Sequence, residues 1–211
     1  MVFDMDGLLL DSERLARDCF LQACADVGWP ADLAAYDLCV GGTYESTERI
    51  LIAAYGPDFP YARLSECWGA HYEAYIQTRP VAVKAGAREL LDHLADLGIP
   101  RALATSTRRA TALQKLRLAG LEDYFSHLVC GGETPRGKPH PDPYLEATRR
   151  LSHPPGQCWA LEDSNNGVRA AHAAGLRVFQ VPDLVQPDPQ VAALGHQVVG
   201  SLFEVLELLL D

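Results

Sequence analysis

Apolar and polar residues alternate differently on the two sides of about residue 80. Between Asp11 and Arg79 the apolar side chains recur only at helical spacing. The clearest stretches are 14–27, 44–54 and 64–76, separated by glycines at 28, 41–42 and 56. We therefore predict a helical unit, and we interpret its aromatic residues as a helix–helix core rather than a cofactor site.

After residue 80, short apolar runs alternate with longer amphipathic stretches. The predicted strands are 100–104, 128–130, 158–161 and 176–181. The predicted helices are 88–97, 107–118, 141–151 and 164–174, with a terminal helix around 206–210. Short strands that alternate with helices are typical of a parallel sheet with helices on both faces. The fold class is therefore predicted to be α/β, with a Rossmann-like sheet.

The first apolar run, Val2–Phe3, precedes the helical unit and completes the predicted sheet. This order predicts a sheet unit of residues 1–12 and 80–211, with residues 13–79 inserted as a separate helical unit. Only three residues precede Asp4, which is short for a central strand and leaves open whether residues precede Met1.

Residues with side chains suited to catalysis or metal binding follow the predicted strands, at the edge where parallel sheets bind ligands. Asp4 and Asp6 follow the first strand two positions apart, so an extended backbone points both to the same side. The other candidates lie after the second strand, before the third helix of the sheet unit and after the fourth strand: Thr105, Ser106, Lys138, Glu162 and Asp163. Each alone could be a helix cap or a surface charge. Their joint occurrence at one sheet edge favours a functional site.

Four carboxylates at one edge repel each other, which implies a divalent cation. An all-oxygen set of ligands favours Mg²⁺ over zinc or copper. Such a site can use one carboxylate to attack phosphorus and a second carboxyl to move protons, while lysine and Mg²⁺ neutralise the phosphoryl oxygens.

Four segments resemble the motifs of the haloacid dehalogenase-like superfamily, in order and over nearly the whole chain. They are Phe3–Glu13, Ala104–Ser106, Gly137–Pro143 and Leu161–Gly167. The resemblance implies that Asp4 is the nucleophile and Asp6 the general acid/base. It also implies that Thr105, Ser106 and Lys138 bind the phosphoryl group, with Lys138 steadying Asp4.

The same resemblance implies that Asp4, the Asp6 carbonyl and Asp163 hold Mg²⁺, with Glu162 supporting it. Residues 13–79 stand where the family carries its α-helical cap, and residues 1–12 and 80–211 become the catalytic core. The cap loop then supplies the candidates for substrate specificity: Gly42, Thr43, Tyr44 and Thr47.

The segments are most similar to the β-phosphoglucomutase-like and pseudouridine-5′-phosphatase-like enzymes. Mutases of this kind carry a histidine in the first cap helix, where this chain has 14–17 without histidine, and an arginine where it has Tyr44. Both differences favour a phosphomonoesterase acting on a small phosphorylated metabolite, such as a sugar phosphate or a nucleoside 5′-monophosphate. A sugar phosphomutase and a non-catalytic phosphate-binding module are the alternatives.

Charge and cysteine content narrow the class of partners. The net charge is −10 and no cluster of lysine or arginine is present, so we expect neither nucleic acid nor a membrane surface as partner. Six cysteines occur without a Cys-x-x-Cys pair, which predicts reduced thiols in a cytoplasmic protein. We expect a monomer or a weak homodimer.

Overall fold

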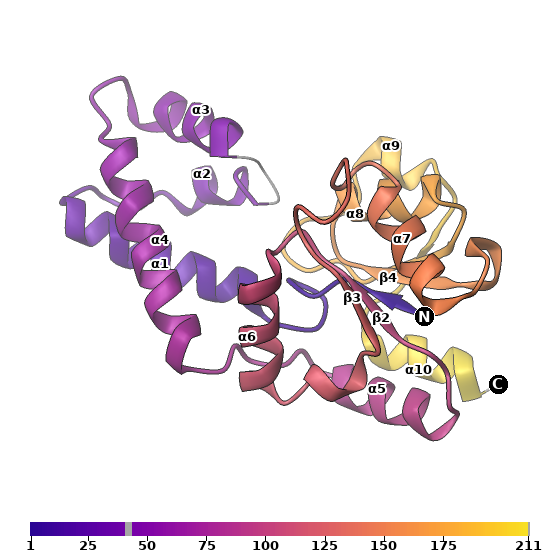
Figure 1. Ribbon diagram of the computed structural model, residues 1–211. Coiled ribbons are helices and arrows are strands. Elements are labelled where there is room, and N and C mark those ends of the chain that lie inside the picture. Colours follow the sequence, from indigo (N-terminus) through magenta and orange to yellow (C-terminus); the bar gives the residue numbers. More distant parts are fainter. Residues whose placement is uncertain (41–43, 211) are drawn as a thin grey trace. The chain divides into compact units, whose positions relative to one another are not determined.

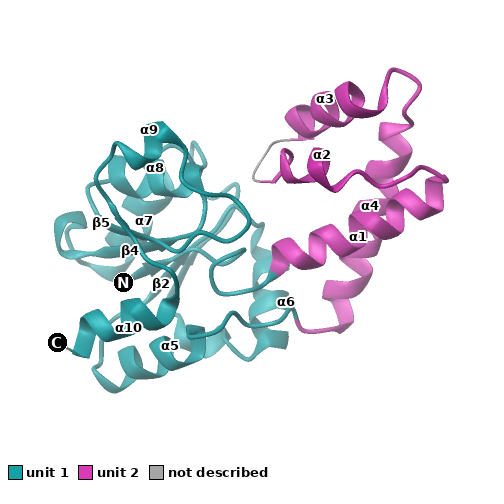
Figure 2. Cartoon of the chain, turned by 180° about the vertical axis from the view of Figure 1, so that it is seen from behind, with its two compact units in different colours: residues 1–11, 81–211 teal, residues 12–80 magenta. Residues whose placement is uncertain are grey.

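The computed structural model describes residues 1–40 and 44–210. The described chain divides into two compact units, one of residues 1–11 and 81–211 and one of residues 12–80 (Figure 2). No helix in the described part is long and apolar enough to cross a membrane.

Unit 1 contains a parallel sheet of six strands in the order β3-β2-β1-β4-β5-β6. The strands are β1 (Val2–Phe3), β2 (Ala102–Ala104), β3 (His127–Val129), β4 (Trp159–Glu162), β5 (Arg177–Gln180) and β6 (Gln197–Val198). The central strand β1 pairs with β2 on one side and with β4 on the other. The predicted α/β fold with a Rossmann-like sheet is confirmed.

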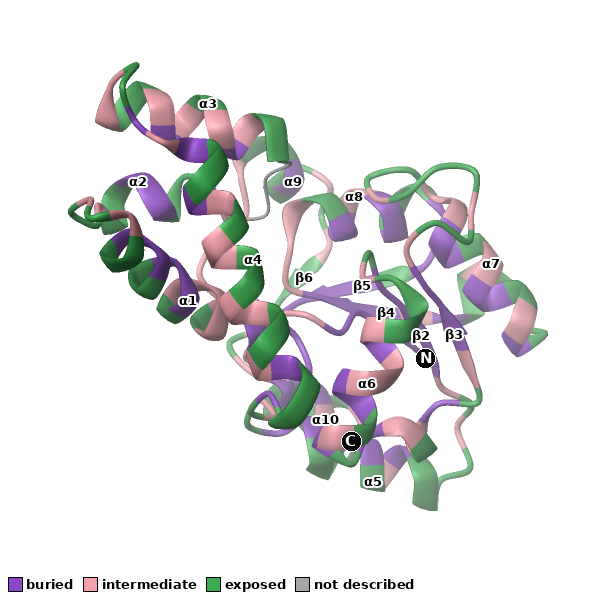
Figure 3. Ribbon diagram, turned by 60° about the vertical axis from the view of Figure 1, so that its left-hand side comes forward, coloured by how far each residue is buried: buried purple, intermediate pink, exposed green. Residues whose placement is uncertain are grey.

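The strands are short and mostly buried, and helices lie on both faces of the sheet (Figures 1 and 3). One face carries α7 (Asp142–Leu151), α8 (Asn165–Ala173) and α9 (Pro189–Ala192). The other carries α5 (Ala87–Asp96), α6 (Arg109–Ala119) and α10 (Leu202–Leu210). Two short 3₁₀ helices, Glu122–Tyr124 and Pro155–Gln157, lie before β3 and β4.

Helix α5 shows why the sheet unit assembles as the sequence predicts. Leu90, Leu91 and Leu94 are fully buried on one face of the helix. Burying side chains of this size stabilises a fold by about 1.5–3 kcal/mol each. Helix α8 begins after Ser164, whose hydroxyl accepts from the Gly167 N–H at 3.1 Å and caps the helix.

The described residues of unit 2 form four helices: α1 (Ser12–Val27), α2 (Leu33–Asp37), α3 (Tyr44–Tyr55) and α4 (Tyr61–Thr78). Their core includes Phe20, Tyr36 and Leu64. The Phe20 ring lies 5.0 Å from Tyr36 and 5.3 Å from Trp68. Most aromatic residues of this unit therefore belong to a packed helix–helix core, as the sequence predicts.

Candidate active site

The site is centred on Asp4, the residue after the central strand β1. The Asp4 N–H donates to the Leu161 carbonyl of β4 at 3.0 Å, which fixes the backbone here. Its side chain is buried, and Lys138 Nζ lies 2.5 Å from Asp4 Oδ1. The same ammonium also contacts Glu162 Oε1. One buried lysine therefore bridges two buried carboxylates that are 158 residues apart in sequence.

Glu162, the last residue of β4, is completely buried and accepts hydrogen bonds through both oxygens. The Asp163 and Ser164 N–H groups and the Ser164 hydroxyl donate to Oε2 at 3.1–3.2 Å. The Tyr144 hydroxyl donates to Oε1 at 2.6 Å, beside Lys138. Glu162 is thus held in place by donors of the chain, which suits it to supporting its neighbours rather than to binding a ligand directly.

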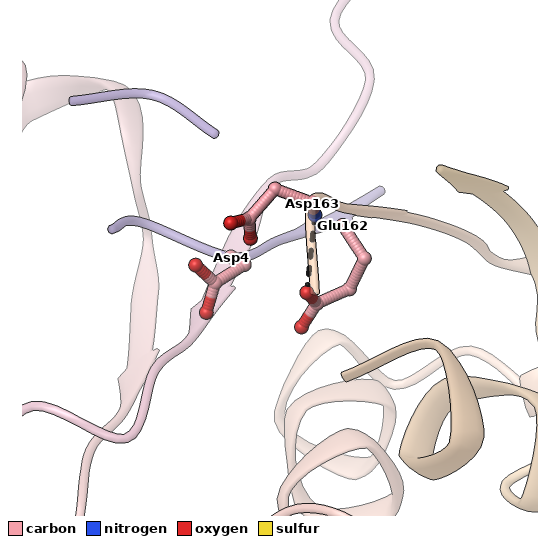
Figure 4. Close-up of side chains that lie close together, drawn as sticks. All are labelled: Asp4, Glu162 and Asp163. Atoms are coloured by element: carbon pink, nitrogen blue, oxygen red, sulfur yellow. Dashed lines mark hydrogen bonds between the residues drawn. The ribbon is translucent and has the colours of Figure 1, made fainter. Parts of the chain in front are cut away.

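Asp163 adds a third carboxylate beside Asp4 and Glu162. Asp4, Glu162 and Asp163 each offer one oxygen, and the three oxygens lie within 4.8 Å of one another (Figure 4). Gly7 passes close by with a φ of +83°, and a Cβ at this position would overlap the Asp163 carboxyl group. The turn after β1 can therefore approach Asp163 only because residue 7 is glycine.

The donor set fits Mg²⁺. Asp4 and Glu162 share one buried ammonium, Lys138, and a carboxyl oxygen of Asp163 lies close to both. All the offered atoms are oxygen, the ligand type that Mg²⁺ prefers. A divalent cation would reduce the repulsion between carboxylates held this close together.

Burial raises the pKa of the Asp4 carboxyl to about 7. Lys138 opposes this increase, whereas the Glu162 and Asp6 carboxylates add to it. Burial lowers the pKa of Lys138, but Asp4 and Glu162 outweigh that effect and raise it above its ordinary value. Lys138 is consequently an ammonium ion at neutral pH, and Asp4 is the group whose charge the surroundings leave poorly compensated.

Asp6 lies on the same turn as Asp4 and is held by two side chains from another segment. Lys115 Nζ lies 2.7 Å from Asp6 Oδ1, and the Thr107 hydroxyl donates to Asp6 Oδ2 at 2.6 Å. Neither partner is among the residues predicted from the sequence. The sequence does contain a signal for Lys115, because it lies on the same helix face of α6 as the buried residues Ala112, Leu116 and Ala119. A lysine at such an apolar position indicates a buried charged partner.

Thr105 and Ser106 lie in the loop between β2 and α6. Thr105 is buried, and its hydroxyl accepts from the Thr107 N–H at 3.1 Å. Ser106 is exposed, and its carbonyl group lies against Gly131, where no Cβ could fit. The structure thus places both residues at the carboxyl end of β2, and their binding of a phosphoryl group remains a prediction.

The predicted specificity residues belong to the other unit or cannot be placed. Gly42 and Thr43 lie outside the described residues. Tyr44 begins α3 and is 54% exposed, with its ring 5.2 Å from that of Tyr61. Thr47 is buried within the same unit. A contact between these residues and a substrate remains a prediction.

Comparisons with known proteins agree on one family. The model of the haloacid dehalogenase-like hydrolases matches residues 1–175. The Drosophila melanogaster protein named "Probable pseudouridine-5'-phosphatase" is 35% identical over 188 residues, which cover 86% of this chain and 80% of that protein. A phosphorylated carbohydrates phosphatase of Thermotoga maritima is 30% identical over 99% of this chain and 97% of its own.

Solved structures show the same similarity. A Deinococcus radiodurans protein of this family, crystallised with bound phosphate and sodium, superposes with a TM-score of 0.84. It is 30% identical in sequence, and the match covers 99% of this chain and 93% of the other.

Proposed function

The chain belongs to the haloacid dehalogenase-like hydrolase family, and we propose that it is a Mg²⁺-dependent phosphomonoesterase that forms an aspartyl-phosphate on Asp4. Its relatives are named phosphatases, and the broader activity, hydrolysis of phosphorylated small molecules, follows from that family relationship. One observation carries the finer proposal: buried Lys138 bridges Asp4 and Glu162 beside Asp163.

In the proposed reaction an oxygen of Asp4 attacks phosphorus, and the bond from phosphorus to the ester oxygen breaks. Asp6 gives its proton to the departing oxygen. Water then attacks the phosphorus of the aspartyl-phosphate while Asp6 takes a proton from that water, which releases phosphate and restores Asp4. Lys138, held against Asp4, offsets negative charge as it develops.

Mg²⁺ would be held by the Asp4 and Asp163 carboxylates and the Asp6 carbonyl, and would neutralise charge on the phosphoryl oxygens. The fit rests on the close approach of the carboxylate oxygens and on the all-oxygen donor set. Glu162 supports this arrangement through Lys138 and Tyr144 rather than as a ligand.

Metal dependence provides the first test. We expect a chelator to abolish hydrolysis of a chromogenic phosphate monoester and added Mg²⁺ to restore it. Asp163→Asn is expected to raise the Mg²⁺ concentration needed for half-maximal rate by more than Glu162→Gln does. Glu207→Gln removes an exposed charge on α10 and serves as the control. Full activity in excess chelator would contradict the metal assignment.

We propose that the substrate is a small phosphorylated metabolite of the sugar phosphate or nucleoside 5′-monophosphate type. A panel of such compounds, assayed for released phosphate, tests this class directly. The expected result is free phosphate in proportion to the substrate consumed. Transfer of the phosphoryl group to another hydroxyl, without free phosphate, would instead identify a mutase.

A further inference from the structure

Lys115 is a buried lysine with no place in the four motif segments. It lies in the second turn of α6, is 3% exposed and places its ammonium group 2.7 Å from Asp6 Oδ1. Lysine is almost never fully buried without a partner, because transfer of its charge out of water is costly. The ion pair with Asp6 supplies that partner across 109 residues of sequence.

The register of α6 directs Lys115 toward the interior. The buried positions of the helix are Ala112, Lys115, Leu116 and Ala119, which recur at the spacing of one helix face. A charge at a core position of this stripe lowers stability unless something compensates it. The ion pair between Lys115 and Asp6 therefore points to a role for Lys115 in the function of Asp6.

Thr107 acts on the same carboxyl group from the loop that precedes α6. Its hydroxyl donates to Asp6 Oδ2 at 2.6 Å, while Lys115 holds Oδ1. The Thr107 N–H donates to the Thr105 hydroxyl at 3.1 Å, a contact within the same loop. Two donors on the two oxygens fix both the direction and the plane of the Asp6 carboxyl.

We propose that Lys115, together with Thr107, is the positioning residue for Asp6 in proton transfer to the leaving group. The inference rests on the proposed function, in which Asp6 is the general acid/base. A protonated Asp6 carboxyl can accept from Lys115 and Thr107 through lone pairs of its two oxygens while its O–H donates to the ester oxygen, so these contacts are compatible with proton transfer. Lys115 acts through Asp6 and needs no contact with the substrate.

This role has a signature that a structural role lacks. Loss of a correctly placed general acid slows the release of a poor leaving group, whereas p-nitrophenolate leaves without protonation. The test therefore compares kcat/KM for an alkyl phosphate from the substrate panel with kcat/KM for p-nitrophenyl phosphate. Both constants report the steps up to cleavage of the ester bond.

For Lys115→Met we expect kcat/KM for the alkyl phosphate to fall at least about tenfold more than for p-nitrophenyl phosphate, part of the ~10²–10⁴-fold that general acids contribute. Arg117→Met is the matched control, since it removes a cation from the same helix whose partner, Glu122, lies at the surface. The control is expected to leave the ratio of the two constants unchanged. An equal loss on both substrates in Lys115→Met would overturn the inference.

Asp6→Asn separates this inference from the proposed function. If Asp6→Asn shows no selective loss on the alkyl phosphate, the acid role of Asp6 itself fails. If Asp6→Asn shows it and Lys115→Met does not, only the role of Lys115 fails. In the Asp6→Asn background, Lys115→Met should change the ratio no further.

Folding of the variants is checked by thermal unfolding, because loss of one partner of a buried ion pair is destabilising. If Lys115→Met does not fold, the same ratio is measured for Lys115→Gln, which removes the charge and is too short to keep the donor at the Asp6 carboxyl. A selective loss on the alkyl phosphate supports the inference, and an unchanged ratio overturns it.

Discussion

Asp4 combines two properties that oppose each other, burial and the negative charge that a nucleophile requires. Burial raises its pKa to about 7, although Lys138 lies 2.5 Å away. Lys138 is shared with Glu162, so its charge cannot compensate both carboxylates fully. A further positive charge beside Asp4 would favour its ionised form, and Mg²⁺ would supply that charge in the proposed reaction.

Asp4→Asn is expected to reduce phosphatase activity to below about 1%, since an amide of the same shape is a poor nucleophile. The fold should remain intact, because the amide oxygen of the variant can still accept from Lys138. Circular dichroism and the rate of phosphate release check the two expectations. Retention of more than a few per cent of the activity, in a preparation free of wild-type enzyme, would contradict the assignment of Asp4.

The same variant tests the electrostatics of the metal-free protein. The pKa of Asp4 is higher in the folded protein than its ordinary value of 3.8, so the folded state favours the protonated carboxyl. The ionised carboxylate therefore destabilises the fold, and the full effect is present above about pH 7. The effect decreases as the pH falls from 7 toward 3.8. Without metal, Asp4→Asn should therefore unfold at a higher temperature than wild type at about pH 8, and the difference should shrink at about pH 5. Differential scanning calorimetry in chelator measures both values, and a difference independent of pH would argue against this account.

Tyr144 supports the site from α7. Its hydroxyl donates to Glu162 Oε1 at 2.6 Å, and Lys138 Nζ lies 5.2 Å from its ring centre. Tyr144→Phe removes one donor to a buried carboxylate, so we expect a loss of about 1–3 kcal/mol in the free energy of unfolding and a lower kcat. Tyr124→Phe removes a hydroxyl that contacts Asp92 at the surface, and should change neither quantity appreciably.

The site residues that could be predicted from the sequence are those in the four motif segments. Asp4, Lys138, Glu162 and Asp163 were predicted at one sheet edge, and the structure brings them together. Thr107, Lys115 and Tyr144 were not predicted as site residues. Their partners lie 18 to 109 residues away in sequence, so only the folded chain shows which groups meet.

At the scale of elements, the long amphipathic helices and buried strands follow the hydrophobic pattern. The exceptions are the short elements α2, α9 and β6, of two to five residues. They contain too few residues to establish a period, so tertiary contacts determine them. Helix α6 begins at Arg109 rather than at residue 107, and this difference leaves Thr107 in the loop where it reaches Asp6.

The turn after β1 is a single element whose geometry can be tested. Gly7→Ala places a Cβ at a φ of +83° and against the Asp163 carboxyl group. We expect a loss of about 1–2 kcal/mol in stability from the backbone conformation, together with weaker Mg²⁺ binding because Asp163 must move. Gly98→Ala is the matched control, since its φ is +65° and its Cβ would meet no atom within 4 Å.

The control should therefore lose stability without losing affinity for Mg²⁺, as measured by calorimetric titration. If both variants bind Mg²⁺ as wild type does, the close approach of Gly7 to Asp163 is irrelevant to the metal.

Helix α3 carries the proposed contribution of the cap to specificity. Tyr44 is 54% exposed at its first position. Tyr44→Ala should change kcat/KM unequally across the substrate panel and leave the Mg²⁺ dependence unchanged. Leu38→Ala, at a residue that is 72% exposed in the same unit, serves as the control and should leave the profile unaltered. A uniform loss on every substrate in Tyr44→Ala would place the specificity determinants elsewhere.

At the scale of the whole molecule, the chain separates into a sheet unit and a helical unit. The α/β class was predictable because the period of apolar residues changes near residue 80 and the chain returns to the same sheet. The assignment of catalysis to one unit and specificity to the other is still a prediction. The net charge of the protein is −10, yet the site places a buried ammonium against two carboxylates, so the site contains a positive charge within a chain that is acidic overall.

The central claim is that the phosphoryl group is transferred to Asp4 as a covalent aspartyl-phosphate before hydrolysis. Rapid acid quenching during turnover, followed by borohydride reduction and peptide mass spectrometry, converts an aspartyl-phosphate into homoserine at the modified position. The account predicts homoserine at position 4, dependent on substrate and Mg²⁺ and absent from Asp4→Asn. Two results for the wild-type enzyme during turnover would contradict it. One is homoserine at a different carboxylate. The other is an unmodified position 4 although the first turnover shows a stoichiometric burst of alcohol release.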